Sequence, residues 1–477
     1  PGTYLEMLVM TKPIQLQGWG AATTIINPVQ SPTEKIAAWR DKLNYLANCT
    51  HEIGLLPNQP NNAAGSGACG FVPGTGLFAN EEGAGVLVAP AAGVFGGAVA
   101  RIDGFTISGA DQSGGVLVNG YATGLEISNN IIRNNQGPYA AGIRVGQPLL
   151  LQVDDATGTE TPVDAQNDNI RIHHNHVTQN GGLFEAGAGI GLYTGSDGYQ
   201  VSRNYVCGNN AGGNGAGVAH YGLSTNGRIA DNKILFNQAF DQTVANSGNG
   251  GGIAVAGYAI VGGGTPGVGS VDIERNLIQG NNAGSGRGGG ISVQLVAQGG
   301  GNNPQKLVRI TNNVIANNVA GYAGGGIAMD SAARVTITNN TIVNNDSSGT
   351  AALAFCNAGA PSQSCPQPAG VVADGGNIGN EGFRNNIVLG NRAYHITLGT
   401  DGGVTSVLDG YWDLNGTALY SGGAGSTNGI RNSLLSAAGA FNGGDSVPVL
   451  GSPGSYCSAT RANTCVTPTA TLYGSHF

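Results

Sequence analysis

The sequence predicts an all-β protein coiled as a parallel β-helix, with three short strands per turn and about ten or more turns. First, the pattern [IVF]-x-x-N-x-[IV]-x-x-N occurs eight times between Ile127 and Asn391, always in the same register. Second, successive copies are at least 27 residues apart, a unit too small to bury a core unless neighbouring units stack. Third, the apolar positions alternate with period two and are mostly β-branched, which favours strands over helices.

Each repeat supplies three strands. Strand one starts at a glycine followed by Ile or Val, strand two ends just before the first asparagine of the pattern, and strand three follows that asparagine. The glycines are Gly142, Gly189, Gly217, Gly252, Gly290, Gly326 and Gly370, and the first asparagines are Asn130, Asn175, Asn204, Asn232, Asn276, Asn313, Asn340 and Asn386. Asparagine tolerates a left-handed backbone at such a bend, and stacked about 4.8 Å apart these side chains can form a hydrogen-bonded ladder.

One helix is predicted in residues 31–48, SPTEKIAAWRDKLNYLAN. Ser31 is placed as the N-cap, Pro32 at the first helical position and Glu34 as the partner in a capping box. The apolar face comprises Ile36, Trp39, Leu43 and Leu46. We interpret this helix as a cap over the open end of the coil, with a substrate lid as the alternative.

Composition limits the function classes. Charged residues make up 10% of the chain, with 20 basic against 28 acidic residues, so the sequence does not predict nucleic-acid binding. No apolar run reaches the roughly 18 residues that a membrane helix needs, so we expect a soluble chain without a membrane span.

Six of the seven cysteines fall into three close pairs within loops, Cys49 with Cys69, Cys356 with Cys365, and Cys457 with Cys465. These pairs predict disulfides and therefore an oxidising, extracellular or cell-surface location, with metal binding as the alternative. The seventh, Cys207, is expected to be a small core residue.

Several motifs resemble a known family. The asparagine bend, the opening PGTY, IQLQGWG and IDGFTISGA are similar to right-handed parallel β-helix proteins of the pectate-lyase-like class. The later NNIVLGN and GSPGS are similar to closing segments of bacterial secreted and surface members. The resemblance implies a right-handed coil over residues 1–400, with a helical and loop insertion at 31–84 and an irregular segment at 401–477. It implies chemistry only weakly, because the scaffold serves lyases, glycosidases, epimerases and non-catalytic surface proteins.

Insertions indicate where a site lies. The bend between strands two and three has constant length, whereas long inserts flank strand one, so strand one is the expected floor of a groove. If the Ile or Val of strand one points inward, the residues one and three positions after it point outward. The nearer outward column is mostly small, from Gly191 to Ala328, and would let another chain pack in a homo-oligomer or filament. The further column is Asn119, Gly146, Tyr193, Tyr221, Ala256, Gln294, Asp330 and Asp374.

We expect Tyr193, Tyr221, Gln294, Asp330 and Asp374 to bind a ligand, because tyrosine rings beside polar groups suit sugars. No catalytic or metal-binding residue is assigned outright. As an alternative, Asp330 and Asp374 on adjacent turns could act as an acid and base or share Ca²⁺. A group of acidic residues is interpreted as part of a solvated loop: Asp154, Asp155, Glu160, Asp164 and Asp168. We interpret His173, His174 and His176 as surface residues, and His220 as a buried residue with one hydrogen bond.

These observations favour a secreted or cell-surface structural and recognition module that contacts a glycan or a neighbouring protein along strand one. The alternative is a polysaccharide-active enzyme, a lyase, glycosidase or epimerase acting on an acidic polysaccharide. Specific catalytic signatures of polygalacturonases and pectate lyases are absent from the sequence. No cofactor is required by this interpretation, although Ca²⁺ is compatible with the paired carboxylates.

Overall fold

The structure is a computed structural model of the 477-residue chain. It describes residues 1–57, 59, 69, 82–96, 99–183, 186–241, 248–261, 265–296, 307–332, 334–355, 362–374, 382–415 and 434–435. Within these residues no helix is both long enough and apolar enough to cross a membrane.

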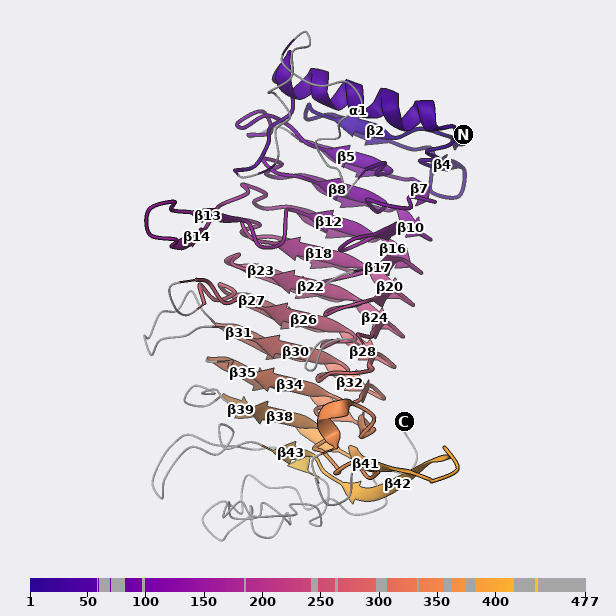
Figure 1. Cartoon of the computed structure of the whole chain (residues 1–477), viewed down its shortest axis with the longest axis vertical. Coiled ribbons are helices and arrows are strands. Elements are labelled where there is room, and N and C mark those ends of the chain that lie inside the picture. The colour runs from indigo at the N-terminus through magenta and orange to yellow at the C-terminus, as the bar shows by residue number, and fades with distance from the viewer. Residues whose placement is uncertain are drawn as a thin grey trace.

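Three long parallel sheets wind around one axis, as the repeats predict, and their strands stack from the N-terminal to the C-terminal end of the rod (Figure 1). We name them by the strand of the repeat that they contain. The strand-one sheet comprises β2 (Leu8–Met10), β5 (Val86–Val88), β8 (Val116–Val118), β12 (Ile143–Val145), β18 (Ile190–Tyr193), β22 (Val218–Tyr221), β26 (Ile253–Ala256), β30 (Ile291–Gln294), β34 (Ile327–Asp330), β38 (Val371–Asp374) and β43 (Leu414–Asn415).

The two other long sheets follow along each turn. The strand-two sheet comprises β3 (Gln15–Gln17), β6 (Arg101–Asp103), β9 (Glu126–Ser128), β15 (Arg171–His173), β19 (Gln200–Ser202), β23 (Gly227–Ala230), β27 (Val271–Glu274), β31 (Val308–Thr311), β35 (Val335–Thr338) and β39 (Phe383–Arg384). The strand-three sheet comprises β1 (Gly2–Tyr4), β4 (Thr24–Ile26), β7 (Thr106–Ser108), β10 (Ile131–Arg133), β16 (His176–Thr178), β20 (Tyr205–Cys207), β24 (Lys233–Leu235), β28 (Leu277–Gln279), β32 (Val314–Ala316), β36 (Thr341–Val343), β40 (Ile387–Leu389) and β44 (Leu434–Leu435).

A fourth sheet, which the sequence did not predict, lies between strands three and one. This short-strand sheet comprises β11 (Gln136–Gly137), β17 (Gly181–Gly182), β21 (Asn210–Ala211), β25 (Gln238–Ala239), β29 (Asn282–Ala283), β33 (Val319–Ala320), β37 (Asp346–Ser347), β41 (Arg392–Leu398) and β42 (Val404–Tyr411). Most of its strands have only two residues, too few to show an apolar alternation. Outside the coil, β13 (Leu151–Val153) and β14 (Glu160–Pro162) form a hairpin, and Ala352–Ala354 form a 3₁₀ turn.

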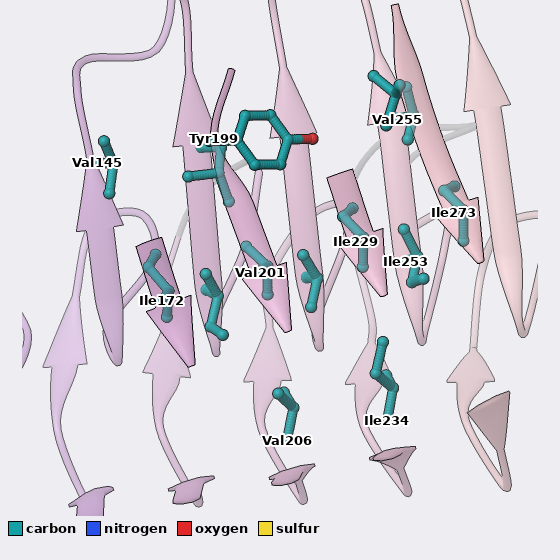
Figure 2. Packing of buried hydrophobic residues seen from close by; sticks show 14 of the residues in the cluster. Val145, Ile172, Tyr199, Val201, Val206, Ile229, Ile234, Ile253, Val255 and Ile273 are labelled. Carbon is teal, nitrogen blue, oxygen red and sulfur yellow. The ribbon is translucent and has the colours of Figure 1, made fainter. Parts of the chain in front are cut away.

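The interior is filled by aliphatic side chains that stack turn upon turn. Figure 2 shows one such column on the strand-two sheet, Ile172, Val201, Ile229 and Ile273, facing residues of the other sheets. Each member pairs in register with the next, so identical positions lie one strand spacing apart. The predicted inward orientation of the Ile or Val of strand one is confirmed by Ile253 and Ile291, which are fully buried in this core.

Two asparagine ladders run along the corners. In the first, the amide oxygen of each asparagine accepts the backbone N–H and the side-chain N–H of its equivalent in the preceding turn, as Asn204 Oδ1 does from Asn175 at 3.0 and 3.1 Å. The second ladder uses the second asparagine of the pattern, and Asn209 Oδ1 accepts from Asn180 at 3.0 and 2.9 Å. The sequence predicted the first ladder correctly, and the other asparagine column forms an equivalent one.

The prediction was wrong about which residue of the bend takes the left-handed backbone. The ladder asparagines do not adopt the left-handed backbone. The residue before each one does, for example Arg203 before Asn204 and Arg275 before Asn276, with φ of 56° and 55°. The asparagine is therefore required for its amide hydrogen bonds, whereas its neighbour takes the left-handed conformation.

Helix α1 (Thr33–Asn48) forms as predicted, without the predicted cap. It begins at Thr33, with Pro32 in the N-cap position and no side-chain cap, so neither the Ser31 cap nor the capping box forms. Its buried face packs on Leu87 and Leu117, the central outward residues of β5 and β8, and not on the inward core. The helix thus packs against outward residues of the strand-one sheet, and it lies across the N-terminal end of the rod (Figure 1).

Four of the seven cysteines lie among the described residues. Cys49 and Cys69 form the predicted disulfide, with Cα atoms 5.0 Å apart. Cys365 is also disulfide-bonded, while its expected partner Cys356 lies outside the described residues, as do Cys457 and Cys465. Cys207 is free and half-buried on the outward side of β20, because Val206 takes the inward position, so the expectation of a core cysteine was wrong.

Candidate functional site

The outer surface of the strand-one sheet is less open than the insertions suggested. The nearer outward column is buried, although its residues point away from the core: Arg144, Ala219, Ala254, Ser292, Ala328 and Val372. The glycine-rich loops that precede strands such as β22 and β34 fold back over this column. A Cβ atom on Gly215 would lie 2.8 Å from the Ala219 Cβ, and one on Gly324 would lie 2.7 Å from a Val372 methyl carbon. The chain's own loops therefore occupy the surface that we expected another chain to use.

The expected ligand-binding tyrosines divide into two cases. Tyr193 is fully buried, where its hydroxyl donates to the Ala186 carbonyl and accepts from the Ala140 N–H. Its ring also lies beside the buried Arg144 guanidinium. This corrects the prediction for Tyr193, which has no surface to offer. Tyr221 is half-buried, with its ring centroid 6.1 Å from that of Tyr258.

The other three predicted residues come together near the C-terminal end of the sheet. Gln294, Asp330 and Asp374 end the adjacent strands β30, β34 and β38, directly opposite one another in register. All three are half-buried. The Ser331 hydroxyl donates to the Asp330 carboxylate at 3.1 Å.

Two residues that the sequence did not single out complete this site. Arg287 reaches across two turns to form an ion pair with Asp374, and its guanidinium carbon lies 4.6 Å from the centre of the Tyr322 ring. The Arg287 side chain is only 12% exposed, compared with 45% for Asp374. Its Nε is buried and finds no hydrogen-bond partner among the described residues. We call Arg287, Gln294, Tyr322, Asp330 and Asp374 the Arg287 cluster.

Arg287 and Tyr322 were not predicted as site residues because they lie in loops outside the repeat pattern. Both lie in the glycine-rich loops that fold over the sheet, Arg287 three residues before Gly290 and Tyr322 four residues before Gly326. Most neighbouring positions in these loops are glycine or alanine. A large polar or aromatic residue within such a run is the only sequence signal that could have identified them.

The chemistry of the cluster suits recognition. A guanidinium stacked on an aromatic ring is held in one orientation, and it donates several hydrogen bonds in a plane. The carboxylates and the Gln294 amide add acceptors and donors along the strand direction at one strand spacing. Asp374 already accepts from Arg287, so the two carboxylates differ in their surroundings. Such an array can pair with hydroxyl groups that repeat along a polymer.

No site for a metal ion is formed where the structure describes the chain, since no three acidic, histidine or cysteine side chains converge there. In the acidic insert, Asp154 accepts from the Thr157 and Ala156 N–H groups of its own turn, which lowers its pKa. The Glu160 carboxylate accepts from the Val261 N–H at 2.8 Å. Burial raises the pKa of Asp168. At least Asp154 and Glu160 therefore serve local structure.

The three clustered histidines do not converge either. His173 lies on the strand-two sheet, where its Nδ1 is 2.9 Å from the Nδ1 of His174. His176 lies on the strand-three sheet, beyond the bend, and its ring packs near Tyr205. Burial lowers the pKa of His173.

The parallel sheets, the repeat and the ladders together define a right-handed parallel β-helix repeat protein. Residues 78–257 match the family model described as the right handed beta helix region. Neither a curated protein nor a solved structure was found to match the chain.

Proposed function

We propose that this protein is a secreted or cell-surface recognition module that binds a glycan at the Arg287 cluster. The observation that carries this proposal is the alignment of Gln294, Asp330 and Asp374 in register beside an arginine stacked on Tyr322. Most of the nearer outward column is covered by the chain's own loops, whereas these residues remain accessible. The Cys49–Cys69 disulfide supports an oxidising location, because disulfides persist outside the reducing cytosol.

A second candidate is a polysaccharide-active enzyme that uses Asp330 and Asp374. It is favoured by one observation, the direct pairing of the two residues on adjacent strands. Glycosidases use a pair of carboxylic residues that flank the scissile bond. The ion pair between Asp374 and Arg287 argues for recognition, because it occupies one carboxylate with a structural partner.

We expect Asp374→Asn to weaken glycan binding tenfold or more, and Tyr322→Ala, which removes the ring beside the Arg287 guanidinium, to weaken it severalfold. Losing a charged hydrogen-bonding group costs roughly 1.5–3 kcal/mol, and about 1.4 kcal/mol corresponds to a factor of ten in affinity. Affinity electrophoresis against a panel of acidic and neutral polysaccharides measures the change. Asp330→Asn provides a third variant that leaves the Arg287 ion pair in place.

The matched control is Asp272→Asn, because Asp272 pairs with Arg309 on the strand-two sheet at 2.7 Å, away from the cluster. Its binding should equal that of the unmodified protein. The proposed module would be refuted if the cluster variants bind as tightly as the unmodified protein, or if the unmodified protein binds no polysaccharide of the panel. Release of new reducing or unsaturated ends that Asp330→Asn abolishes would instead establish the enzyme.

A further inference from the structure

The Arg287 cluster covers its cation and exposes its carboxylates. The Arg287 side chain is 12% exposed, whereas the Asp374 side chain with which it forms an ion pair is 45% exposed. The guanidinium lies beside the Tyr322 ring, with its central carbon 4.6 Å from the ring centre, and this contact helps to hold it in place. A ligand that approaches from solvent therefore meets the Asp374 carboxylate before it meets the guanidinium.

Asp330 adds a second carboxylate without adding a cation. Among the described residues Asp330 forms no ion pair, and its carboxylate accepts only from the Ser331 hydroxyl at 3.1 Å. It lies directly opposite Asp374 on the adjacent strand, at a spacing of about 4.8 Å between the strands. One guanidinium thus serves two neighbouring carboxylates, and the cluster keeps one negative charge that no cation within it neutralises.

We infer, on the basis of the glycan recognition proposed above, that the ligand is a polymer of amino sugars whose free ammonium groups pair with Asp330 and Asp374. An ammonium group donates three hydrogen bonds and carries the charge that the cluster lacks, whereas a sugar hydroxyl brings a donor without the charge. Hydrogen bonds from a charged donor to a carboxylate are roughly twice as strong as those between neutral groups. Amino sugars should therefore bind more tightly than neutral sugars.

The same arrangement disfavours acidic glycans. Carboxylate or sulfate groups on a sugar would face the Asp330 and Asp374 carboxylates, and like charges brought together oppose binding. Arg287 is the one member of the cluster that could bind such groups, but it is largely buried and already paired with Asp374. The Gln294 amide, directly opposite Asp330, is uncharged and can form hydrogen bonds with a neighbouring sugar hydroxyl. The charges of the cluster thus select an amino sugar over a uronic acid.

Binding of a glucosamine polymer, measured before and after N-acetylation, tests this assignment. The two ligands share one backbone, and at mildly acidic pH only the unacetylated polymer carries ammonium groups. We expect the unmodified protein to bind the unacetylated polymer at least tenfold more tightly, as measured by isothermal titration calorimetry. A galacturonate polymer, which is acidic, should bind more weakly than either. This comparison uses only the unmodified protein, so it does not depend on how any variant folds.

Two variants separate recognition from general attraction, because the chain has a formal net charge of −8 at pH 7 and attracts any polycation. Asp330→Asn should lower the ratio of the two affinities at least threefold. Asp272→Asn removes the same charge from the strand-two sheet and should leave the ratio unchanged. An equal fall of the ratio in both variants, or equal affinity of the unmodified protein for both polymers, overturns the amino sugar as the ligand.

The amino-sugar ligand and the recognition module fail in different ways. If Asp374→Asn weakens binding of the N-acetylated polymer while the free amine gives no advantage, recognition at the Arg287 cluster stands and the amino sugar is excluded. If no cluster variant changes the binding of either polymer, the Arg287 cluster is not the binding site and both proposals are overturned.

Discussion

Replacing Asn209 by alanine is expected to lower the free energy of unfolding by about 4 kcal/mol. The Asn209 side chain accepts two hydrogen bonds from Asn180 and donates two, to the Val177 carbonyl and the Asn237 amide oxygen, at 2.9–3.0 Å. Alanine leaves several of these buried groups without partners, each at a cost of roughly 1–3 kcal/mol. Guanidinium-induced unfolding followed by circular dichroism measures the loss.

The next residue provides the control. Asn210 is the same residue type, but its side chain points outward from β21 and is exposed. Asn210→Ala should change the free energy of unfolding by less than about 0.5 kcal/mol, as surface substitutions usually do. If the two variants lose equal stability, the ladder has no special role and the effect comes from strand propensity alone.

The C-terminal end of the ladder that contains Asn209 shows that its hydrogen bonds all run in one direction. Every member donates its side-chain N–H to the next turn, so the last member needs only an acceptor. That place is taken by Asp413, whose carboxylate accepts from the Asn391 side chain at 2.8 Å and from its backbone N–H at 3.3 Å. A carboxylate is suited to the terminus of a ladder and unsuited to its interior, where it would face another acceptor oxygen.

The sequence was sufficient for the coil because its determinants repeat in register. The position of Asn232 is asparagine in all eight repeats, and that of Ile229 is Ile, Val or Phe, so the pattern leaves one stacking arrangement. Cys207 could have been placed correctly by the same logic, since it follows the inward Val206 and must point out. Its assignment to the core ignored the alternation along a strand.

The site depended on how irregular segments fold, which a repeat pattern does not record. Helix α1 has an apolar face, but the sequence does not say whether Leu87 outside the coil or the open end will cover it. In the same way, glycine-rich loops could stand away from the sheet or lie upon it. They lie upon it, so Tyr193 became buried while Arg287 reached Asp374.

Lowering the pH from 7 to 4.5 is expected to destabilise the protein by roughly 2 kcal/mol through His220 alone. His220, predicted to be a buried residue with a single hydrogen bond, is fully buried and contacts three partners. Its Nδ1 is 2.8 Å from the Tyr199 hydroxyl, and its Nε2 is 3.0 and 2.9 Å from the carbonyl oxygens of Gly222 and Val268. The carbonyls require a proton on Nε2, so Nδ1 accepts from Tyr199, whose own pKa is raised by burial.

Burial lowers the pKa of His220 to about 4, against about 6.5 in the unfolded chain. Between these values the unfolded state binds a proton that the folded state does not, so stability is complete above about pH 6.5 and falls as the pH drops toward 4. One pH unit within this window is worth about 1.4 kcal/mol.

Glutamine isolates this contribution. In His220→Gln the amide oxygen can accept from Tyr199 and the amide N–H can donate to the carbonyls, but the side chain does not titrate. The difference in unfolding free energy between pH 7 and pH 4.5 should therefore be smaller in His220→Gln, whereas His176→Gln at an exposed position should keep the full difference. An identical pH dependence in His220→Gln and the unmodified protein would show that His220 takes up its proton in the folded state as readily as in the unfolded chain.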